Sequence, residues 1–265
     1  MADGKGTESA GRVAEVLLAF LEGPRTWGVS AIARELGLSK AVVHRILQTL
    51  VATGLLQSVP ESRDYRLGPA AGALGARALR DSDLRGVAMP VLRALQRQTL
   101  ETTTVSARVT RGRVYLDQVP SDLEIKMTVE VGRRFPLHAG SSSICILAFL
   151  PGDEQDWVLG GELVSLTPKT VTDPTVIRAR LAQVRAVGYA FSGGERQEGA
   201  GAVAAPVFGV DGLVVGAISV CGPAARVDQQ ARDRYAPHLR QAADTISRGL
   251  GWRGGLPDPE KGAHW

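Results

Sequence analysis

Cysteine is scarce in this sequence, which excludes a secreted scaffold built on disulfides. The 265 residues include only Cys145 and Cys221, which lie far apart in apolar surroundings. The four histidines are scattered along the chain, so we expect no metal site, and no pattern calls for a cofactor. Few thiols and no disulfide framework fit a reducing cytosol.

Long apolar runs are also missing. The first twelve residues, MADGKGTESAGR, lack the apolar segment of a secretory signal peptide. The longest uncharged stretch, Phe135–Gly152, contains two prolines, a histidine and three consecutive serines, so it is a poor membrane span. We therefore expect a soluble, cytoplasmic protein with no membrane partner. Hydrophobic residues make up 44% of the chain, enough to bury a core in one or two domains.

Basic charge is concentrated near the N-terminus. Residues 24–80 contain eight basic and three acidic residues, a net charge of +5, whereas the whole chain carries +4. The remainder is therefore close to neutral. A basic segment on a near-neutral body is typical of a DNA-binding domain, with chance clustering as the alternative.

The same segment has the periodicity of a helix-turn-helix. After a polar segment that is expected to be a disordered tail, residues 1–11, apolar residues recur at helical spacing over 13–21. Ser30 and Ser39 are candidate N-caps for two further helices, joined at Gly37. Two alternating runs around PESR then predict a β-hairpin, so residues 12–69 should form a winged helix-turn-helix.

The third predicted helix has one apolar stripe and one polar face, as a recognition helix requires. An ordinary solvated helix face is the alternative interpretation. The hairpin adds basic residues suited to phosphate or minor-groove contacts. The predicted DNA-binding residues are Arg34, Ser39, Lys40, Ala41, His44, Arg45, Gln48, Arg63 and Arg66.

Beyond an Ala-rich helical linker, residues 70–83, the pattern becomes mixed. Pro90 interrupts an amphipathic stretch, either as a first-turn proline or as a kink. TTTVSARV, RVYLDQV and EIKMTVEV predict strands, as do AGAVAAPVFG and LVVGAISVCG, which meet at a turn at Asp211-Gly212. Helices are expected after Ser141, from residue 174 to Gly188, and over about 228–250. Residues 84–251 should thus form an α+β domain with a mostly antiparallel sheet, followed by a flexible tail, 252–265.

The sequence contains no recognisable catalytic pattern. GAGAVA, residues 199–204, has a dinucleotide-binding spacing, but Pro206 and β-branched residues follow where a helix is required. The serines at 141–143 have no visible His–acid partnership, so helix capping and anion binding explain them better than nucleophilic catalysis. We therefore do not expect an enzyme. A hydrolase fused to a DNA-binding head, and a winged helix that binds protein, are the alternatives.

Several stretches together resemble the IclR family of bacterial transcription regulators, from about residue 12 to residue 251. They are GLSKAVVHRILQTLVATGLL with DYRLG, GRRFPLHA, GYAFSGGERQEGAGAVAAPV and GAISVCGPAAR. The resemblance implies a winged helix-turn-helix, a helical linker and a GAF-like effector-binding domain. It also implies a homodimer or homotetramer that binds a palindromic double-stranded DNA operator under the control of a small-molecule effector. Repression is expected rather than activation, although no sequence feature separates the two.

The resemblance also places an effector pocket at particular residues of this chain. Where the family has Gly-Lys this chain has Ser143-Ile144, and the usual Asp and Cys are Ser192 and Ala202. We therefore expect a less ionic pocket that takes a small organic acid with an apolar body. The implied effector-binding residues are Met127, Phe135, Ser141, Ser142, Ser143, Ser192, Ala202, Ser219 and Cys221.

Overall fold

The chain forms two compact units, divided between residues 81 and 82. The computed structural model describes residues 8–21, 23–60, 62–80 and 82–255. The two units are described separately below.

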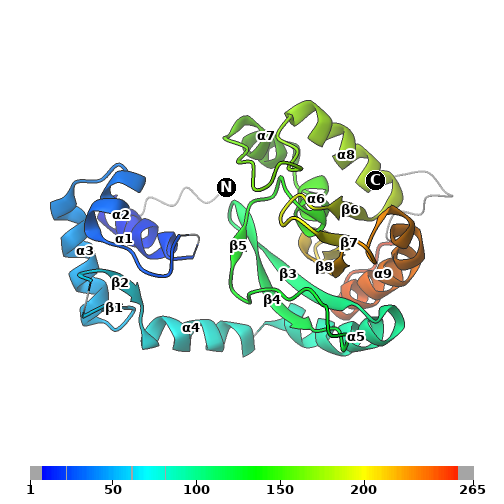
Figure 1. Ribbon diagram of the computed structural model, residues 1–265, viewed down its shortest axis with the longest axis horizontal. Coiled ribbons are helices and arrows are strands. Elements are labelled where there is room, and N and C mark those ends of the chain that lie inside the picture. Colours follow the sequence, from blue (N-terminus) through cyan, green and yellow to red (C-terminus); the bar gives the residue numbers. More distant parts are fainter. Residues whose placement is uncertain (1–7, 22, 61, 81, 256–265) are drawn as a thin grey trace. The chain divides into compact units, whose positions relative to one another are not determined.

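The first unit is a winged helix-turn-helix (Figure 1). The helices α1 (Glu8–Ala19), α2 (Val29–Glu35) and α3 (Lys40–Ala52) enclose a core around Ile32 and Leu47. The strands β1 (Leu56–Ser58) and β2 (Tyr65–Leu67) pair antiparallel as the wing, and Trp27 adds a backbone bridge to Tyr65. The helix α4 (Pro69–Arg80) follows the wing, within the region where the sequence predicted a linker over residues 70–83.

The helix ends in this unit agree only partly with the sequence-based expectations. Ser39 caps α3 as predicted, because its Oγ accepts a hydrogen bond from the Val42 amide at 3.4 Å. The predicted cap at Ser30 is wrong: α2 starts at Val29, and its N-cap is Gly28, two residues before Ser30. The helix α1 begins at Glu8, inside the segment expected to be a polar tail, and residues 1–7 lie outside the described residues.

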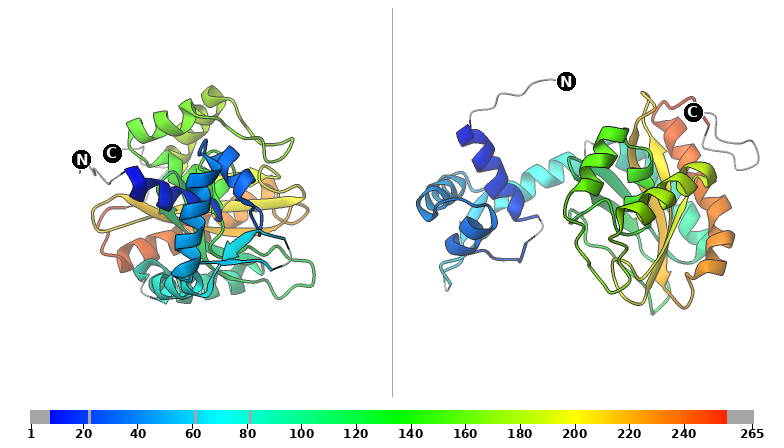
Figure 2. Two further views of the ribbon diagram at one scale, coloured as in Figure 1. Left: turned by 90° about the vertical axis from the view of Figure 1, so that its left-hand side faces the viewer. Right: turned by 90° about the horizontal axis from the view of Figure 1, so that it is seen from above.

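The second unit is an α+β domain built on a six-stranded sheet whose neighbouring strands all pair antiparallel (Figures 1 and 2). The sheet order is β5-β4-β3-β8-β7-β6. Its strands are β3 (Thr102–Val109), β4 (Gly112–Val119), β5 (Arg134–Phe135), β6 (Ala190–Gly193), β7 (Ala200–Phe208) and β8 (Val214–Pro223). Its helices are α5 (Asp83–Thr99), α6 (Ser141–Ala148), α7 (Gly152–Gly160), α8 (Pro174–Val187) and α9 (Gln229–Gly249). The predicted fold class is confirmed.

Strand alternation divides the apolar residues of this sheet between two cores. Val203 and Ile218 point to the face that α5 and α9 cover. Ala204 and Ala217 point to the opposite face, against α6 and α8. The second face therefore carries small side chains at its centre, and this leaves room for a pocket.

The predicted strand EIKMTVEV, residues 124–131, is wrong. This segment is a loop whose backbone groups are satisfied by side chains instead of a neighbouring strand. The amide of Gln118 donates to the Val129 carbonyl at 2.7 Å and accepts from the Val129 N–H at 2.8 Å. The hydroxyl of Thr102 donates to the Met127 carbonyl at 2.6 Å. β-branched composition alone does not make a strand, because strand formation depends on the tertiary contacts of the segment.

The structure also decides the place of Pro90 and of Trp252. Pro90 lies well inside α5, so the first-turn alternative is wrong. Trp252, placed in the flexible tail by the sequence, packs on Phe208 with ring centroids 5.6 Å apart and donates its backbone N–H to Ser247. Residues 256–265 of that tail lie outside the described residues.

Gly201 and its cross-strand partner Gly193 offer a matched test of packing in the sheet. A Cβ at Gly201 would lie 1.8 Å from the Val227 carbonyl oxygen, whereas one at Gly193 would make ordinary contacts of 3.5 Å with Phe191. We expect Gly201→Ala to lower the free energy of unfolding by about 3 kcal/mol, since a tight site cannot absorb a methyl group. Gly193→Ala should change the free energy of unfolding by less than about 1 kcal/mol, because the added methyl group makes no steric clash. Urea unfolding measures both, and similar values for the two variants would contradict the described packing.

Candidate DNA interface and effector pocket

The predicted DNA-binding residues lie on the surface of the first unit. On α3, Val43, Ile46, Leu47 and Leu50 are buried, and the opposite face is exposed. Arg34 is exposed on α2, and Arg66 is exposed on the wing strand β2. The predicted residues that are exposed on α3 and at its N-cap are Ser39, Lys40, Ala41, His44, Arg45 and Gln48. This arrangement is that of a recognition helix beside a basic wing.

Tertiary contacts distinguish two of these side chains. The Gln48 amide donates to the Tyr65 hydroxyl at 3.2 Å, so this residue ties the recognition helix to the wing. Arg45 lies on the other flank, in a hollow between α1 and α3 that it shares with Thr49. No ion pair engages Arg45 among the residues that the structure describes, and its guanidinium is exposed.

Arg63 lies in the loop of the wing with a backbone φ of +56°. This left-handed conformation costs a non-glycine residue roughly 1–2 kcal/mol. Asn or Gly would suit the turn better, so the arginine is present at a cost to stability. An exposed cation at such a position is a candidate functional residue.

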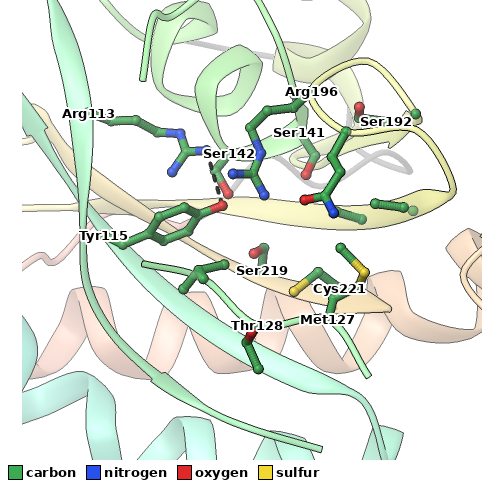
Figure 3. A pocket seen from close by; sticks show the side chains of 17 residues that line it. Arg113, Tyr115, Met127, Thr128, Ser141, Ser142, Ser192, Arg196, Ser219 and Cys221 are labelled. Carbon is green, nitrogen blue, oxygen red and sulfur yellow. Dashed lines mark hydrogen bonds between the residues drawn. The ribbon is translucent and has the colours of Figure 1, made fainter. Parts of the chain in front are cut away.

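A buried pocket opens on the small-residue face of the sheet in the second unit (Figure 3). Its floor is formed by β7 and β8, and its walls by the start of α6, the 127–129 loop and the end of β6. The cavity volume is about 30 Å³. The effector residues that the sequence placed here and that do line the pocket are Met127, Ser141, Ser142, Ser192, Ala202, Ser219 and Cys221.

Phe135 and Ser143 do not line the pocket but lie behind it. The Phe135 ring meets Tyr115 edge-to-face, with centroids 5.5 Å apart. Ser143 is fully buried in α6, where its hydroxyl accepts a hydrogen bond from Arg113 at 2.9 Å. Both residues therefore support the pocket wall instead of forming it.

Arg113 is the central charged group of the pocket, and the sequence analysis missed it. It is 1% exposed, and its guanidinium donates to Ser143, to Ser106 at 2.8 Å and to the Tyr115 hydroxyl at 3.3 Å. Burial lowers the pKa of Arg113, yet a guanidinium keeps its proton in proteins. In sequence, an arginine at the start of a predicted strand looks like a solvated residue, and only its burial reveals its role.

Arg196 is a second cation of the pocket wall that the sequence analysis did not single out. Its side chain passes 3.8 Å from the position of a Cβ on Gly140, the N-cap of α6. The guanidinium carbons of Arg113 and Arg196 lie 5.1 and 4.5 Å from the Phe135 ring centroid. Figure 3 shows the two guanidinium groups ending close together beside Ser142. Aromatic faces attract such cations, which explains how they are held.

No carboxylate lines the pocket among the described residues. The two buried acids nearest to it are each paired with an arginine outside its lining: Glu195 with Arg180 at 2.8 Å, and Glu101 with Arg226. The pocket wall is therefore positively charged. The family-type Lys and Asp are absent, but Arg113 and Arg196 supply positive charge from other elements.

The start of α6 adds a weaker attraction for anions. Gly140 is its N-cap with φ of +88°, and the Gly140 N–H donates to Glu195 Oε2 at 3.3 Å. The three serines occupy the first turn, so the expectation that they cap the helix is wrong. The first amides of a helix have no intrahelical partner, and those of Ser141 and Ser142 belong to residues of the pocket wall.

A winged helix-turn-helix joined to a unit with a buried polar pocket defines a class of protein: a transcription regulator with an effector-binding domain. Family models match both units. "IclR helix-turn-helix domain" covers residues 9–60, and "Bacterial transcriptional regulator IclR C-terminal" covers residues 76–248. The chain belongs to the IclR family, which confirms the resemblance seen in the sequence.

Relatives of known name align over nearly the whole chain. The Escherichia coli K12 regulator XynR is 30% identical over 92% of this chain and 98% of its own length. The glycerol operon regulatory protein of Streptomyces griseus is 33% identical over 92% and 96%. A solved IclR-type structure from Silicibacter sp. TM1040 has a TM-score of 0.83 at 31% identity, covering 95% of this chain and 98% of that one.

An IclR homologue from Microbacterium hydrocarbonoxydans, solved in complex with 4-hydroxybenzoate, has a TM-score of 0.69 at 29% identity. The match covers 92% of this chain and 99% of that one.

Within the described part of this chain, no helix is long and apolar enough to cross a membrane. The same residues contain no group of three His, Cys, Asp or Glu side chains placed to hold a metal ion.

Both thiols should be unreactive in the folded protein. Burial raises the pKa of Cys221 to about 12 and raises that of Cys145 further, although the nearby arginines act in the opposite direction on Cys221. At pH 8 we expect iodoacetamide to alkylate Cys221 roughly a thousandfold more slowly than in urea-unfolded protein, since only the thiolate reacts. Mass spectrometry of timed reactions measures this, and equal rates in both states would contradict the described burial.

Proposed function

We propose that this protein represses transcription by binding a palindromic operator and that a small organic acid in the pocket changes its affinity for DNA. The observation that carries the proposal is the combination of an exposed, basic recognition helix in one unit with a buried, positively charged pocket in the other. The family supports the general role. Repression, the operator symmetry and the acid are proposals for this chain.

Direct base contacts are assigned to the middle of the exposed face of α3. Arg45 and His44 are proposed to determine sequence preference, and Lys40, Arg34, Arg63 and Arg66 to contact phosphate. Gln48 is already bonded to Tyr65, so its first role is to hold the wing against the recognition helix. Ser39 caps the same helix, and Ala41 leaves space for close approach to a base pair.

Arg45→Ala should weaken binding to the operator by about 1–3 kcal/mol more than binding to random DNA, the value of one bidentate base contact. The operator is first obtained by sequencing genomic fragments that the purified protein retains. Arg63→Gly is the matched control: it relieves the left-handed backbone and should weaken both DNAs alike. Equal losses on both DNAs for Arg45→Ala would refute base reading, and retention of no fragment at low salt would refute DNA binding.

A dimer or tetramer is proposed because one winged domain contacts too little DNA. A single module buries roughly 600–1,000 Å² of protein surface, whereas two related by two-fold symmetry read both halves of a palindrome. The helix α4 exposes Leu74, at 63% of its surface, and offers an apolar surface for pairing. Sedimentation at micromolar concentration should show a dimer or a tetramer. Only monomers together with tight operator binding would contradict this.

A regulator fits the pocket better than an enzyme does. The Ser143 hydroxyl is engaged by Arg113, and the Ser219 hydroxyl lies 2.7 Å from Thr104 Oγ1. Neither histidine nor carboxylate lines the pocket among the described residues, so no serine there has a general base. The 4-hydroxybenzoate complex of a relative supports an organic acid as the effector of this chain. Deleting the gene and measuring transcripts beside the retained fragments decides between repression and activation.

A further inference from the structure

We infer that the effector of this protein is a small dianion, a dicarboxylate or a phosphate monoester, held between Arg113 and Arg196. This inference rests on the proposed function, because it names the chemical class of the ligand that the pocket receives. It differs from the expectation drawn from the sequence, which was a less ionic ligand with an apolar body.

The first step is the number of uncompensated charges. The pocket wall carries two guanidinium groups and no carboxylate among the described residues. The neighbouring acids Glu195 and Glu101 are already paired with Arg180 and Arg226. Cys221 is neutral near pH 7, since burial raises the pKa of its thiol to about 12. Neutralising the wall therefore takes two negative charges from a ligand.

The second step is the free hydrogen-bonding capacity of Arg113. A guanidinium has five N–H groups, and this one donates one bond each to Ser143, Ser106 and Tyr115. Two N–H groups remain on a side chain that is 1% exposed and lines the pocket. A buried cation without a counter-ion is unfavourable, and an anion that supplies one is bound strongly.

The third step is the position of Arg196, which is only partly buried. It approaches from the loop after β6, beside the start of α6, whereas Arg113 approaches from β4 (Figure 3). Both guanidinium groups are held against Tyr115 and Phe135, so neither is free to swing away without losing these contacts. One negative group of the ligand would meet Arg113, and the second would meet Arg196 and the Ser141 and Ser142 amides.

Arg133 provides a matched control. Its guanidinium carbon also lies 5.1 Å from the Phe135 ring, yet it is not part of the pocket wall and faces Glu130 at 3.8 Å. A loss caused only by disturbing the aromatic pair would appear in Arg133→Met. A loss caused by removing a ligand contact would appear only in Arg113→Met and Arg196→Met.

The test compares dianions with monoanions of matched shape by calorimetry on the full chain at fixed ionic strength. Malonate, succinate and inorganic phosphate are the dianionic probes, and acetate and butyrate are the monoanionic ones. We expect at least one dianion to bind the wild type ten or more times more tightly than either monoanion. Arg196→Met should abolish this preference, Arg113→Met should abolish binding, and Arg133→Met should change neither. Binding of a dicarboxylate but not of phosphate, or the reverse, identifies the source of the charge.

Folding and DNA binding are measured on the same samples. Arg113→Met should unfold at a lower urea concentration than the wild type, because the buried hydroxyls of Ser143, Ser106 and Tyr115 lose their donor. If that variant fails to fold, the half-buried Arg196 is the residue on which the inference is tested. No dianion preference in the wild type, or a preference that survives in Arg196→Met, overturns the inference. A protein that prefers dianions but retains no DNA refutes the proposed function alone. One that binds its operator yet prefers monoanions refutes only the inference.

Discussion

The buried guanidinium of Arg113 is the interaction around which the second unit is organised. Its three hydrogen bonds reach Ser106 on β3, Tyr115 on β4 and Ser143 on α6, so one side chain joins two strands to the helix that covers them. A charge at this depth costs several kcal/mol unless its neighbours compensate it. Hydroxyl groups and aromatic faces stabilise the buried charge in part. An anionic ligand can supply the remaining stabilisation. Structural order and ligand affinity thus depend on the same group.

The sheet makes this arrangement possible because its two faces differ. Towards α5 and α9 it presents Val203, Val220 and similar side chains, which pack into a closed core. Towards α6 it presents Ala202, Ser219 and Cys221, whose small side chains leave a hollow. The 124–131 loop closes one side of that hollow through side-chain hydrogen bonds to its backbone. Opening such a loop costs less free energy than separating a paired strand, so a ligand can enter without disturbing the sheet.

The first unit presents a rigid, exposed surface that is suited to binding DNA. The apolar stripe of α3 fixes the orientation of its exposed face, and the Gln48–Tyr65 hydrogen bond fixes the wing beside it. A ligand in the second unit alters DNA binding only through its different affinities for two arrangements of the protein. A strongly charged pocket suits this task, because filling it changes the electrostatic free energy of the unit by a large amount.

Local sequence determined most elements and the function class. The stripe of α3, the cap at Ser39, the Asp173 cap with Gly188 as the stop of α8, and the Asp211-Gly212 turn all follow from residues close together in the chain. The family resemblance placed Ser219 and Cys221 in the pocket, and both residues line it. These features depend on hydrogen bonds and periodicities that span a few residues, which a sequence displays directly.

Tertiary structure alone decided which charges are buried and which segments pair. Arg113 and Arg196 are 83 residues apart by number and meet only because β4 and the loop after β6 reach the same end of α6. The 124–131 segment has strand-like composition, yet its backbone carbonyls accept hydrogen bonds from side chains of β3 and β4 and not from a neighbouring strand. The sequence around Trp252 predicts a flexible tail, whereas in the structure this residue packs against the Phe208 ring. In each case the deciding contact is distant in sequence, so no local pattern encodes it.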